Sequence, residues 1–532
     1  MPLNDKPNTM VAGSGLGIGG STLLRRLLAL ALLILPANMP AMAGGQLEIT
    51  VVDRETGEPI ACRMHLKNSR GRPQKPRRVP FWDDHFAFDG KITLQLPVGD
   101  YTFEMERGPE YLTRTGHFRI ENFADDVKQV DLGRFVDMSE HGWWSGDLDV
   151  RRPLQEIELL MEADDLHVAQ VATWSNGENP WRDKPLPEEL PVLFDEDRYY
   201  HPMAGRHARA GTELLLFNLP EPPPWAGHST SNDPAGEYPA SIQYALEARR
   251  HEGAWVDSSR PYWWDLPMLV AAGQIDSIQV AHANLCRETA IDSEGDGKPR
   301  DRKLYPAPHG NARWSQDVYF KLLECGLRIP PTAGSGSGAA PNPIGYNRVY
   351  VHVDSEFTYD RWFENLRGGR VMVTNGPLLR PAVNGQLPGY VFRGDAGEKL
   401  EFEIGLTLST REPISYLEIV KNGRVARSIR FADYAVSGRL PGIEFEQSGW
   451  FLLRVVTDQP KTHRFAMTGP YYVEIGGRRR ISKQAVQFFL DWIYQRARQI
   501  QLPDPAKHRE VLDYHRRARD FWQALAAQAN AE

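Results

Sequence analysis

The 532-residue chain has few cysteines and few clusters of basic residues. Three cysteines cannot all pair, so at least one of Cys62, Cys286 and Cys325 is expected to be a free thiol, and their spacing matches no metal-binding motif. The formal net charge is −7, and basic residues gather only at 75–78 and 478–480, which argues against nucleic-acid binding. The expected partner is a small molecule, a glycan or another protein.

The chain also lacks the short motifs of common nucleotide-binding and serine-hydrolase sites. The glycine–serine run at 334–338 is not followed by the Lys-Ser/Thr of a phosphate-binding loop. It spells G-S-G-S-G, but no flanking pattern marks it as a nucleophile elbow. We interpret it as a flexible glycine-rich loop.

Long hydrophobic runs are scarce as well. The run at 27–35 is too short to cross a bilayer, follows Arg25 and Arg26, and precedes the small-residue sequence Ala-Met-Ala at 41–43. This pattern predicts a cleavable signal peptide over 1–43. No later run is long enough for a membrane span, so the mature protein is expected in the periplasm or outside the cell.

The most informative segment lies at 141–176. A strand is predicted over 145–150 and would carry Asp147 and Asp149 on one side, because strand side chains alternate. Helical spacing follows from 154, and a second strand is predicted over 166–173. In such strand–helix–strand units the site lies at the carboxyl ends of the strands, so 149–152 and 174–176 should meet over one pocket.

The segment resembles the CehA/McbA-type, carbaryl-hydrolase-like branch of the PHP (polymerase and histidinol phosphatase) superfamily. The likeness runs in order through roughly 140–380. It is carried by GWWSGDLDV at 142–150, GRHARAGTELLLFNL at 205–219, RPYWWDLP at 260–267, DSIQVAHAN at 276–284, GYNRVYVHV at 345–353 and GRVMVTNGPLL at 369–379. The resemblance implies a distorted (β/α) barrel and, in the family, hydrolysis by metal-activated water.

The residues that bind metal in that family are changed here. The His-x-His of the first strand corresponds to Asp149 and Arg151, and the usual Asp-His-Asn corresponds to Trp-Ser-Asn at 174–176. Where the family often has Gly-Ser-Asp-x-His, this chain has the run 334–338. A hydrolytic metal needs about three protein ligands and an open position, and Arg151 repels cations. The expectation is a retained fold whose metal site is largely lost.

Two interpretations of the remaining polar residues stay open. Asp147, Asp149 and His282 are the candidate catalytic groups, and Asp149, Asp257 and His282 are the ligands if zinc, manganese or iron is bound. Alternatively, Asp149 forms an ion pair with Arg151 or Arg152, and His282 is simply hydrogen-bonded.

A ligand pocket would use polar and aromatic residues near the strand ends. Aromatic rings at 262–264 could stack a sugar or an aromatic ligand, or could be buried packing between helix and barrel. The candidate ligand-binding residues are Arg151, Arg152, Asn176, His207, Asp257, Trp263, Trp264 and Asn284.

The chain divides into several parts by its patterning. The predicted fold class is multidomain α/β plus β: after the signal peptide come a carboxypeptidase-regulatory-like β-sandwich over 44–135, a PHP-like barrel over 136–378, a second β-sandwich over 379–480 and C-terminal helices over 481–532. The polar stretch at 227–236 is a candidate lid for the barrel site.

Three functional hypotheses follow. The chain is a secreted PHP-like protein that binds a small molecule or glycan without the usual metal, a divergent metal-dependent hydrolase of an ester, amide or phosphoester, or a structural or assembly component of the cell envelope. The missing ligands favour the first.

Overall fold

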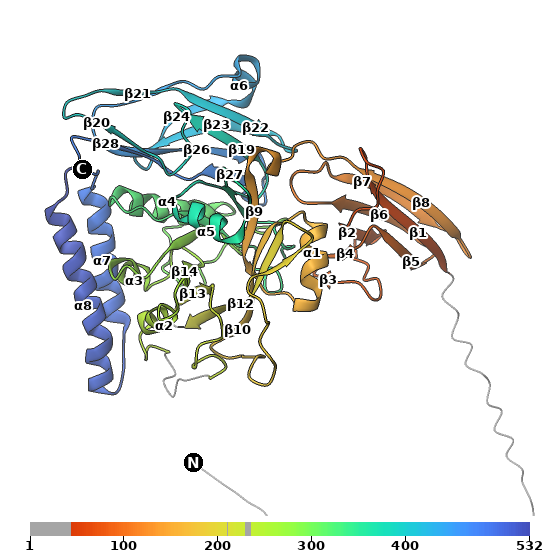
Figure 1. Cartoon of the computed structure of the whole chain (residues 1–532), viewed down its shortest axis with the longest axis horizontal. Coiled ribbons are helices and arrows are strands. Elements are labelled where there is room, and N and C mark those ends of the chain that lie inside the picture. The colour runs from red at the N-terminus through yellow and green to blue at the C-terminus, as the bar shows by residue number, and fades with distance from the viewer. Residues whose placement is uncertain (1–43, 210, 229–235) are drawn as a thin grey trace, which may run out of the picture. The chain divides into compact units, whose positions relative to one another are not determined.

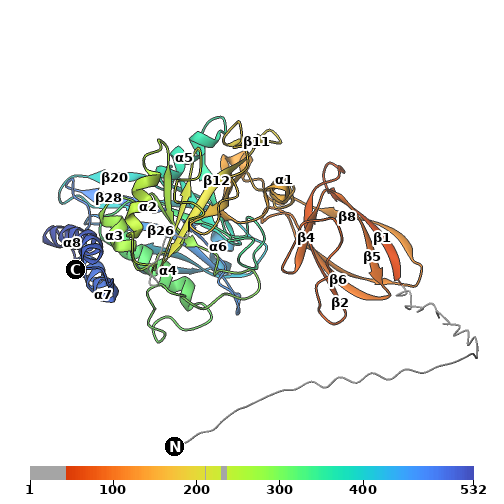
Figure 2. The same ribbon diagram turned by 90° about the horizontal axis from the view of Figure 1, so that it is seen from below.

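The computed structural model describes residues 44–209, 211–228 and 236–532, and all of them belong to one compact unit that begins at Gly44. The predicted signal peptide lies outside the described residues. Figures 1 and 2 show the described part as a β-rich body with a pair of helices at the C-terminal end.

Two sheets made by the first strands share one hydrophobic core. We call them the N-terminal sheets. In β5, Ile92, Leu94 and Leu96 are buried while the residues between them are exposed, as the sequence predicts. One sheet has the order β5-β1-β8 and the other β3-β4-β2-β6-β7, with bounds β1 Gly44–Asp53, β2 Cys62–Asn68, β3 Phe81–Trp82, β4 His85–Phe88, β5 Lys91–Pro97, β6 Gly99–Glu106, β7 Arg114–Ile120 and β8 Asp125–Leu132.

The predicted strand–helix–strand unit is confirmed. It consists of β9 Trp143–Val150, a short 3₁₀ turn, α1 Ile157–Ala163 and β10 Val168–Ser175, and β9 pairs with β10 in parallel. Helix α1 buries Ile157, Leu160 and Met161, which are spaced so that they fall on one face.

A run of strands continues from this unit and returns to it. Its order is β9-β10-β12-β13-β14-β15-β16, with β12 Arg198–Arg209, β13 Thr212–Phe217, β14 Trp255–Ser258, β15 Ser277–Ala281 and β16 Pro331–Ala333. Beyond β16, Val150 and Ser337 form a parallel bridge, and the backbone N–H of Arg151 donates to the carbonyl of Ser337 at 2.7 Å. The two ends of the run therefore meet.

The run at 334–338 makes this closure, and the interpretation of it as a flexible loop is wrong. Ser335 and Ser337 are buried, and the N–H of Gly336 donates to the carbonyl of Asp149. A Cβ at Gly334 would lie 2.6 Å from the Cβ of Asp149. Glycine is needed because two chain segments approach closely, not because the segment must move.

Most strands of the second half of the chain extend the same sheet, while β19 with β22 and β21 with β25 form two small separate sheets. Strand β17 pairs with the far side of β9, and the order then runs β17-β18-β27-β26-β23-β24. The expected boundary at 378/379 is thus no break in the hydrogen-bonded sheet. The bounds are β11 Val192–Phe194, β17 Arg348–His352, β18 Val371–Thr374, β19 Leu378–Val383, β20 Val391–Gly394, β21 Leu400–Phe402, β22 Ile404–Ser409, β23 Ile414–Lys421, β24 Arg424–Arg430, β25 Ile443–Phe445, β26 Gly449–Thr457, β27 Phe465–Thr468 and β28 Tyr471–Ile475.

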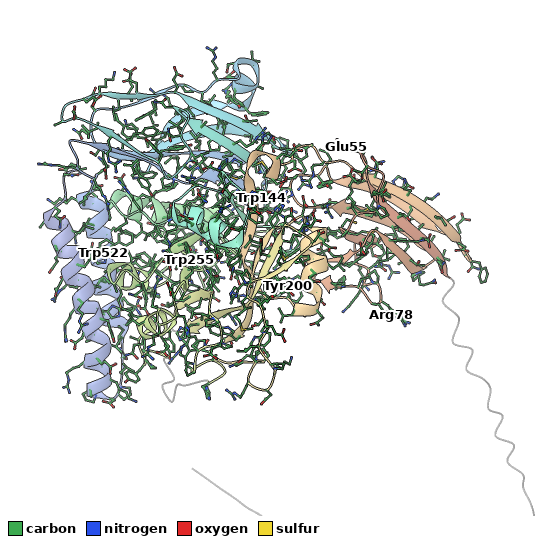
Figure 3. All side chains as sticks on the ribbon, in the orientation of Figure 1. Glu55, Arg78, Trp144, Tyr200, Trp255 and Trp522 are labelled. Carbon is green, nitrogen blue, oxygen red and sulfur yellow. The ribbon has the colours of Figure 1, made fainter. Side chains whose placement is uncertain are left out.

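Helices cover this body. Both C-terminal helices begin where the sequence predicts: Ser482 caps α7 Lys483–Gln499, and Asp504 caps α8 Pro505–Ala527. The indole N–H of Trp522, labelled in Figure 3, donates to the carbonyl of Pro267 and ties α8 to helix α3, Leu266–Ala271. The remaining helices are α2 Ser241–Ala248, α3 Leu266–Ala271, α4 Gly310–Glu324, α5 Tyr359–Arg367 and α6 Phe431–Ser437. Among the described residues, no helix is both long and apolar enough to cross a membrane.

Candidate functional site

Charged side chains gather at one edge of the strand run β9 to β16. Asp149 stands near the carboxyl end of β9, and Arg260 follows β14. Strand β13 is antiparallel to its neighbours β12 and β14, so its amino end, with Glu213, lies at this same edge. We call the set Asp149, Arg151, Arg206, Glu213 and Arg260 the edge cluster.

Arg151 joins the two acids of the edge cluster. Its Nε and Nη2 donate to the two carboxylate oxygens of Asp149 at 2.7 and 2.9 Å, and Nη2 also donates to Glu213 Oε1 at 3.0 Å. Asp149 is buried and the Arg151 side chain is 16% exposed. The guanidinium thus takes both oxygens that Asp149 could offer a metal ion, in the two-point geometry typical of strong Arg–carboxylate pairs. The ion-pair interpretation describes this residue correctly.

The Glu213 carboxylate accepts hydrogen bonds from several side chains. Besides Arg151 it accepts from Arg206 Nη1 at 3.1 Å and from Ser259 Oγ at 2.9 Å. Burial alone would raise the pKa of Glu213, but the positive charges of Arg151, Arg260 and Arg206 outweigh it and lower the pKa to about 2. Glu213 is therefore a fixed negative charge at neutral pH.

Arg260 is the cation of this edge that is not neutralised by contact. Its guanidinium lies over the Trp263 ring, 5.0 Å from the centroid, and the residue as a whole is half-buried. Within the described residues no carboxylate forms an ion pair with it and no hydrogen bond uses it. The edge cluster holds three guanidinium groups and two carboxylates, so it carries excess positive charge.

Asp147 has a structural role next to the edge cluster. Its carboxylate accepts from the backbone N–H groups of Ser335 at 2.9 Å, Gly345 at 2.7 Å and Asp149 at 3.0 Å. Burial raises its pKa to about 6, against the lowering effect of these donors. These bonds hold the segment after β16 against β9.

Asp257 is buried inside the run, and its carboxyl has a raised pKa. It accepts from Ser277 Oγ and from Thr332 Oγ1, on the two strands beyond β14. Burial raises its pKa to about 8.

His282 and Asn284 are held by internal hydrogen bonds. His282 Nε2 pairs with Ser315 Oγ at 2.8 Å, and burial lowers its pKa well below the usual value. Asn284 Nδ2 donates to the Tyr262 hydroxyl at 3.2 Å and to the Ser293 carbonyl at 2.7 Å. Each has a complete structural explanation.

Several predicted ligand-binding residues lie apart from the edge cluster. Arg152 forms an ion pair with Glu156 at 2.6 Å, and its guanidinium lies over the Trp82 ring of the N-terminal sheets. Trp264 is covered by Lys298 and packs at right angles to Trp492 of α7.

Two further polar residues are used in packing. Asn176 bonds to the backbone of Ala208 and extends the pairing of β10 with β12. His207 stacks on Tyr244 with ring centroids 3.7 Å apart, and burial lowers its pKa to about 3.

The aromatic residues at 262–264 form packing rather than an open platform. Tyr262 is fully buried and Trp263 is 7% exposed. The indole N–H of Trp263 donates to Ser259 Oγ at 2.8 Å, and Arg260 covers the ring. The stacking surface left for a sugar is therefore small.

Side chains that could hold a metal ion do occur, but elsewhere. In the part of the chain that the structure describes, the groups with suitable spacing are His65, Asp84 and His85, and His65 with Glu104 and Glu106. The predicted set Asp149, Asp257 and His282 is not among them. No pattern in the sequence indicates the first group, because His65 and His85 become neighbours only through strand pairing.

Residues Arg206, Glu213 and Arg260 were also missed from the sequence. All three lie in the segments that carry the family resemblance, but the signal for Glu213 is the antiparallel direction of β13, which periodicity does not show.

Comparison with known proteins adds little. No family model matches the chain, and no curated protein matches it. The solved Bacillus anthracis TIE protein is similar at 22% identity over 21% of this chain, with a TM-score of 0.14, and the match spans only 20% of that chain. The four N-terminal Ig domains of Dscam1 isoform 7.44 match at 9% identity over 82% of this chain and 73% of that one, also with a TM-score of 0.14. Scores this low carry no argument about fold or function.

Proposed function

We propose that this chain is a secreted protein with a PHP-like barrel of the CehA/McbA type that binds a negatively charged small molecule or glycan without the family's metal. The observation that carries the proposal is the Asp149–Arg151–Glu213 bridge at the carboxyl edge of the strand run. The meeting of β9 with the segment after β16 supports the barrel.

Charge decides what such a site attracts. Asp149 and Glu213 both pair with Arg151, whereas Arg260 is half-buried and forms no ion pair with an acid among the described residues. A guanidinium offers planar, paired N–H donors that match a carboxylate or a phosphate. An anionic group is therefore the expected ligand, with Arg260 as its first contact and Arg206, which is 37% exposed, as the second.

The same arrangement opposes metal-dependent hydrolysis at this edge. A divalent ion would have to displace the Arg151 guanidinium from Asp149, and three guanidinium groups would repel it.

The test is ligand binding by isothermal titration calorimetry on the mature chain. The probes are galacturonic acid and glucose 6-phosphate, with glucose as the neutral control. At least one anionic probe is expected to bind, and Arg260→Gln should weaken it by about tenfold or more, since a charge-assisted hydrogen bond contributes roughly 1.5–3 kcal/mol. Arg367→Gln is the matched control, because Arg367 also stacks on a tryptophan, Trp255, but lies outside the edge cluster.

Three results would overturn the proposal. The first is anion binding that is unchanged in Arg260→Gln. The second is equal binding of glucose. The third is chelator-sensitive hydrolysis of model esters that is lost in Asp149→Asn, which would place a working metal at the edge cluster.

A further inference from the structure

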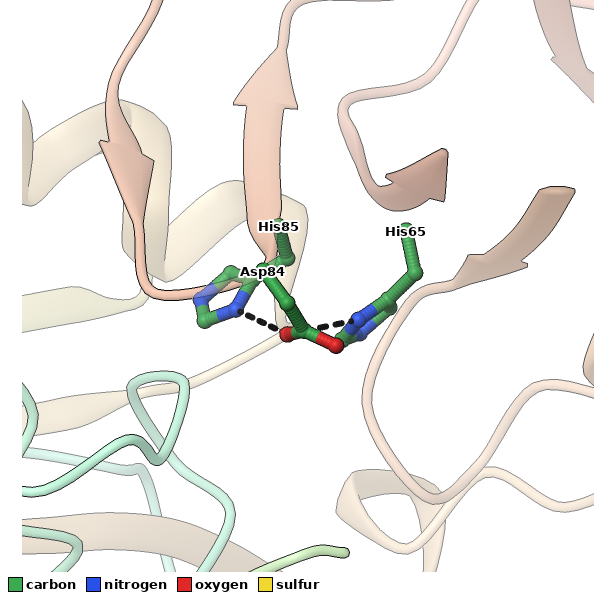
Figure 4. A group of neighbouring side chains, drawn as sticks. All are labelled: His65, Asp84 and His85. Carbon is green, nitrogen blue, oxygen red and sulfur yellow. Dashed lines mark hydrogen bonds and ion pairs between the residues drawn. The ribbon is translucent and has the colours of Figure 1, made fainter. Parts of the chain in front are cut away.

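One row of side chains crosses three neighbouring strands of the N-terminal sheets. In the antiparallel order β4-β2-β6, His65 stands directly opposite His85 on one side and opposite Glu104 on the other. Residues opposite each other in such pairs have Cβ atoms about 4.5–5.5 Å apart and share one face. Asp84, immediately before β4, reaches back between the two imidazole rings (Figure 4).

The distances within this group suit a small cation. Asp84 Oδ1 lies 3.0 Å from His65 Nδ1 and 3.4 Å from His85 Nδ1. Ligand atoms of a tetrahedral zinc ion, each about 2.0–2.1 Å from the metal, are separated by about 3.3 Å. The group is also well enclosed: His65 and His85 are each 4% exposed, and the Asp84 side chain is 14% exposed.

A buried nitrogen without a hydrogen-bond partner also supports a cation site. His65 Nε2 is buried and has no hydrogen-bond partner among the described residues, and it lies 3.9 Å from Glu106 Oε2. If His65 carries its proton on Nδ1 to bond Asp84, the Nε2 lone pair faces a carboxylate, which is unfavourable. If Nδ1 binds a metal instead, Nε2 carries the proton and faces Glu106 favourably, in the carboxylate–histidine–metal order common at zinc sites.

We propose that His65, Asp84 and His85 form a binding site for a divalent cation, with zinc as the expected metal and Nδ1 of both histidines and a carboxylate oxygen of Asp84 as ligands. The fourth position is left to water. The metal would clamp β2 to β4 on the face of the sheet that meets the strand run.

The two glutamates nearby are not ligands in this proposal. Glu106 pairs with Arg63 at 2.5 Å and with Arg287 at 3.2 Å, and Arg287 also pairs with Glu104. The cation that competes for Asp84 is Lys67, at 3.2 Å, whose side chain is 36% exposed and free to swing into solvent. Asp84 can therefore exchange its partner at low cost, whereas the glutamates cannot.

The test is zinc binding by the mature chain, purified without affinity metals, stripped with EDTA and titrated against a chromogenic chelator. One tight equivalent is expected in the wild type and none in His65→Gln or His85→Gln. His117→Gln, an exposed histidine on β7 of the same sheet, is the matched control and should keep the equivalent.

Two further variants distinguish loss of the zinc site from misfolding and from zinc binding at the edge cluster. His85→Cys should bind zinc, and Co²⁺ loaded in its place should gain a thiolate charge-transfer band that the wild type lacks. Asp149→Asn should keep the equivalent. Absence of the equivalent in the wild type would overturn the proposal, as would its persistence in both glutamine variants, or its loss in Asp149→Asn but not in His85→Gln.

Discussion

Asp149 and Arg151, two residues apart at the end of β9, are joined by a pair of hydrogen bonds of 2.7 and 2.9 Å. The family resemblance described from the sequence predicts that these two positions replace a pair of metal-binding histidines. An ion pair therefore stands where a metal would be expected, and it satisfies the buried carboxylate of Asp149 from within the chain.

Replacing Arg151 by methionine should destabilise the fold strongly. The change leaves Asp149 and Glu213 as neighbouring buried carboxylates without their common cation, and breaking a buried pair costs about 3–5 kcal/mol. Thermal unfolding measures the effect. The double variant Asp149→Asn/Arg151→Met should recover part of the loss.

The control for that prediction is Arg119→Met. Arg119 and Asp100 form a pair at 3.4 Å in which both side chains are 64% exposed, so its loss should cost no more than about 1 kcal/mol. Equal shifts in the two single variants would show that Arg151 does not hold a buried charge.

The docking of α7 should depend on one buried arginine. Arg496 donates to Asp265 at 2.7 Å and to both oxygens of Glu237 at 2.9 and 2.6 Å. Arg496→Met should remove the guanidinium that donates to both acids, loosen α7 and α8, and speed hydrogen exchange and proteolysis there. Arg498→Met, at an exposed position on the same helix, should leave both unchanged. Faster exchange confined to the strand run would contradict the prediction.

Local patterns predicted the elements better than the site. The caps at Ser482 and Asp504, the burial stripe of α1 and the alternation of β5 are short-range features, and the structure confirms them. The edge cluster depends on which strands are neighbours and on their direction.

Residues whose positions were predicted wrongly or missed show the same limit of local sequence patterns. Arg152 follows Arg151 directly, yet the two side chains point to different sides of the chain, one to the edge cluster and one to Trp82. The pairing of His65 with His85 depends on a strand register that no local pattern fixes.

All three cysteines should behave as inert thiols. Cys62, Cys286 and Cys325 are all free and buried, so no disulfide joins any two of them. Burial raises the pKa of Cys62 to about 12 and that of Cys286 to about 11, which removes the reactive thiolate at neutral pH. Ellman's reagent should find no fast-reacting thiol in the native protein and three after denaturation. A rapid native reaction, or fewer than three thiols after denaturation, would contradict this.

Asp257 should make stability fall as the pH rises. Burial raises its folded pKa to about 8, whereas the unfolded value is about 3.9. Between these values the folded state keeps a proton that the unfolded state has lost, so folding is favoured at the acidic end and the contribution disappears as the pH approaches 8. The effect is up to about 1.4 kcal/mol for each pH unit.

Asp257→Asn, which cannot titrate, should remove this slope, so its melting temperature relative to wild type should rise from pH 5 to pH 8. Asp126→Asn, at an exposed position on β8, should give a constant difference from wild type. Parallel pH profiles for wild type and Asp257→Asn would show that the Asp257 carboxyl is not held protonated.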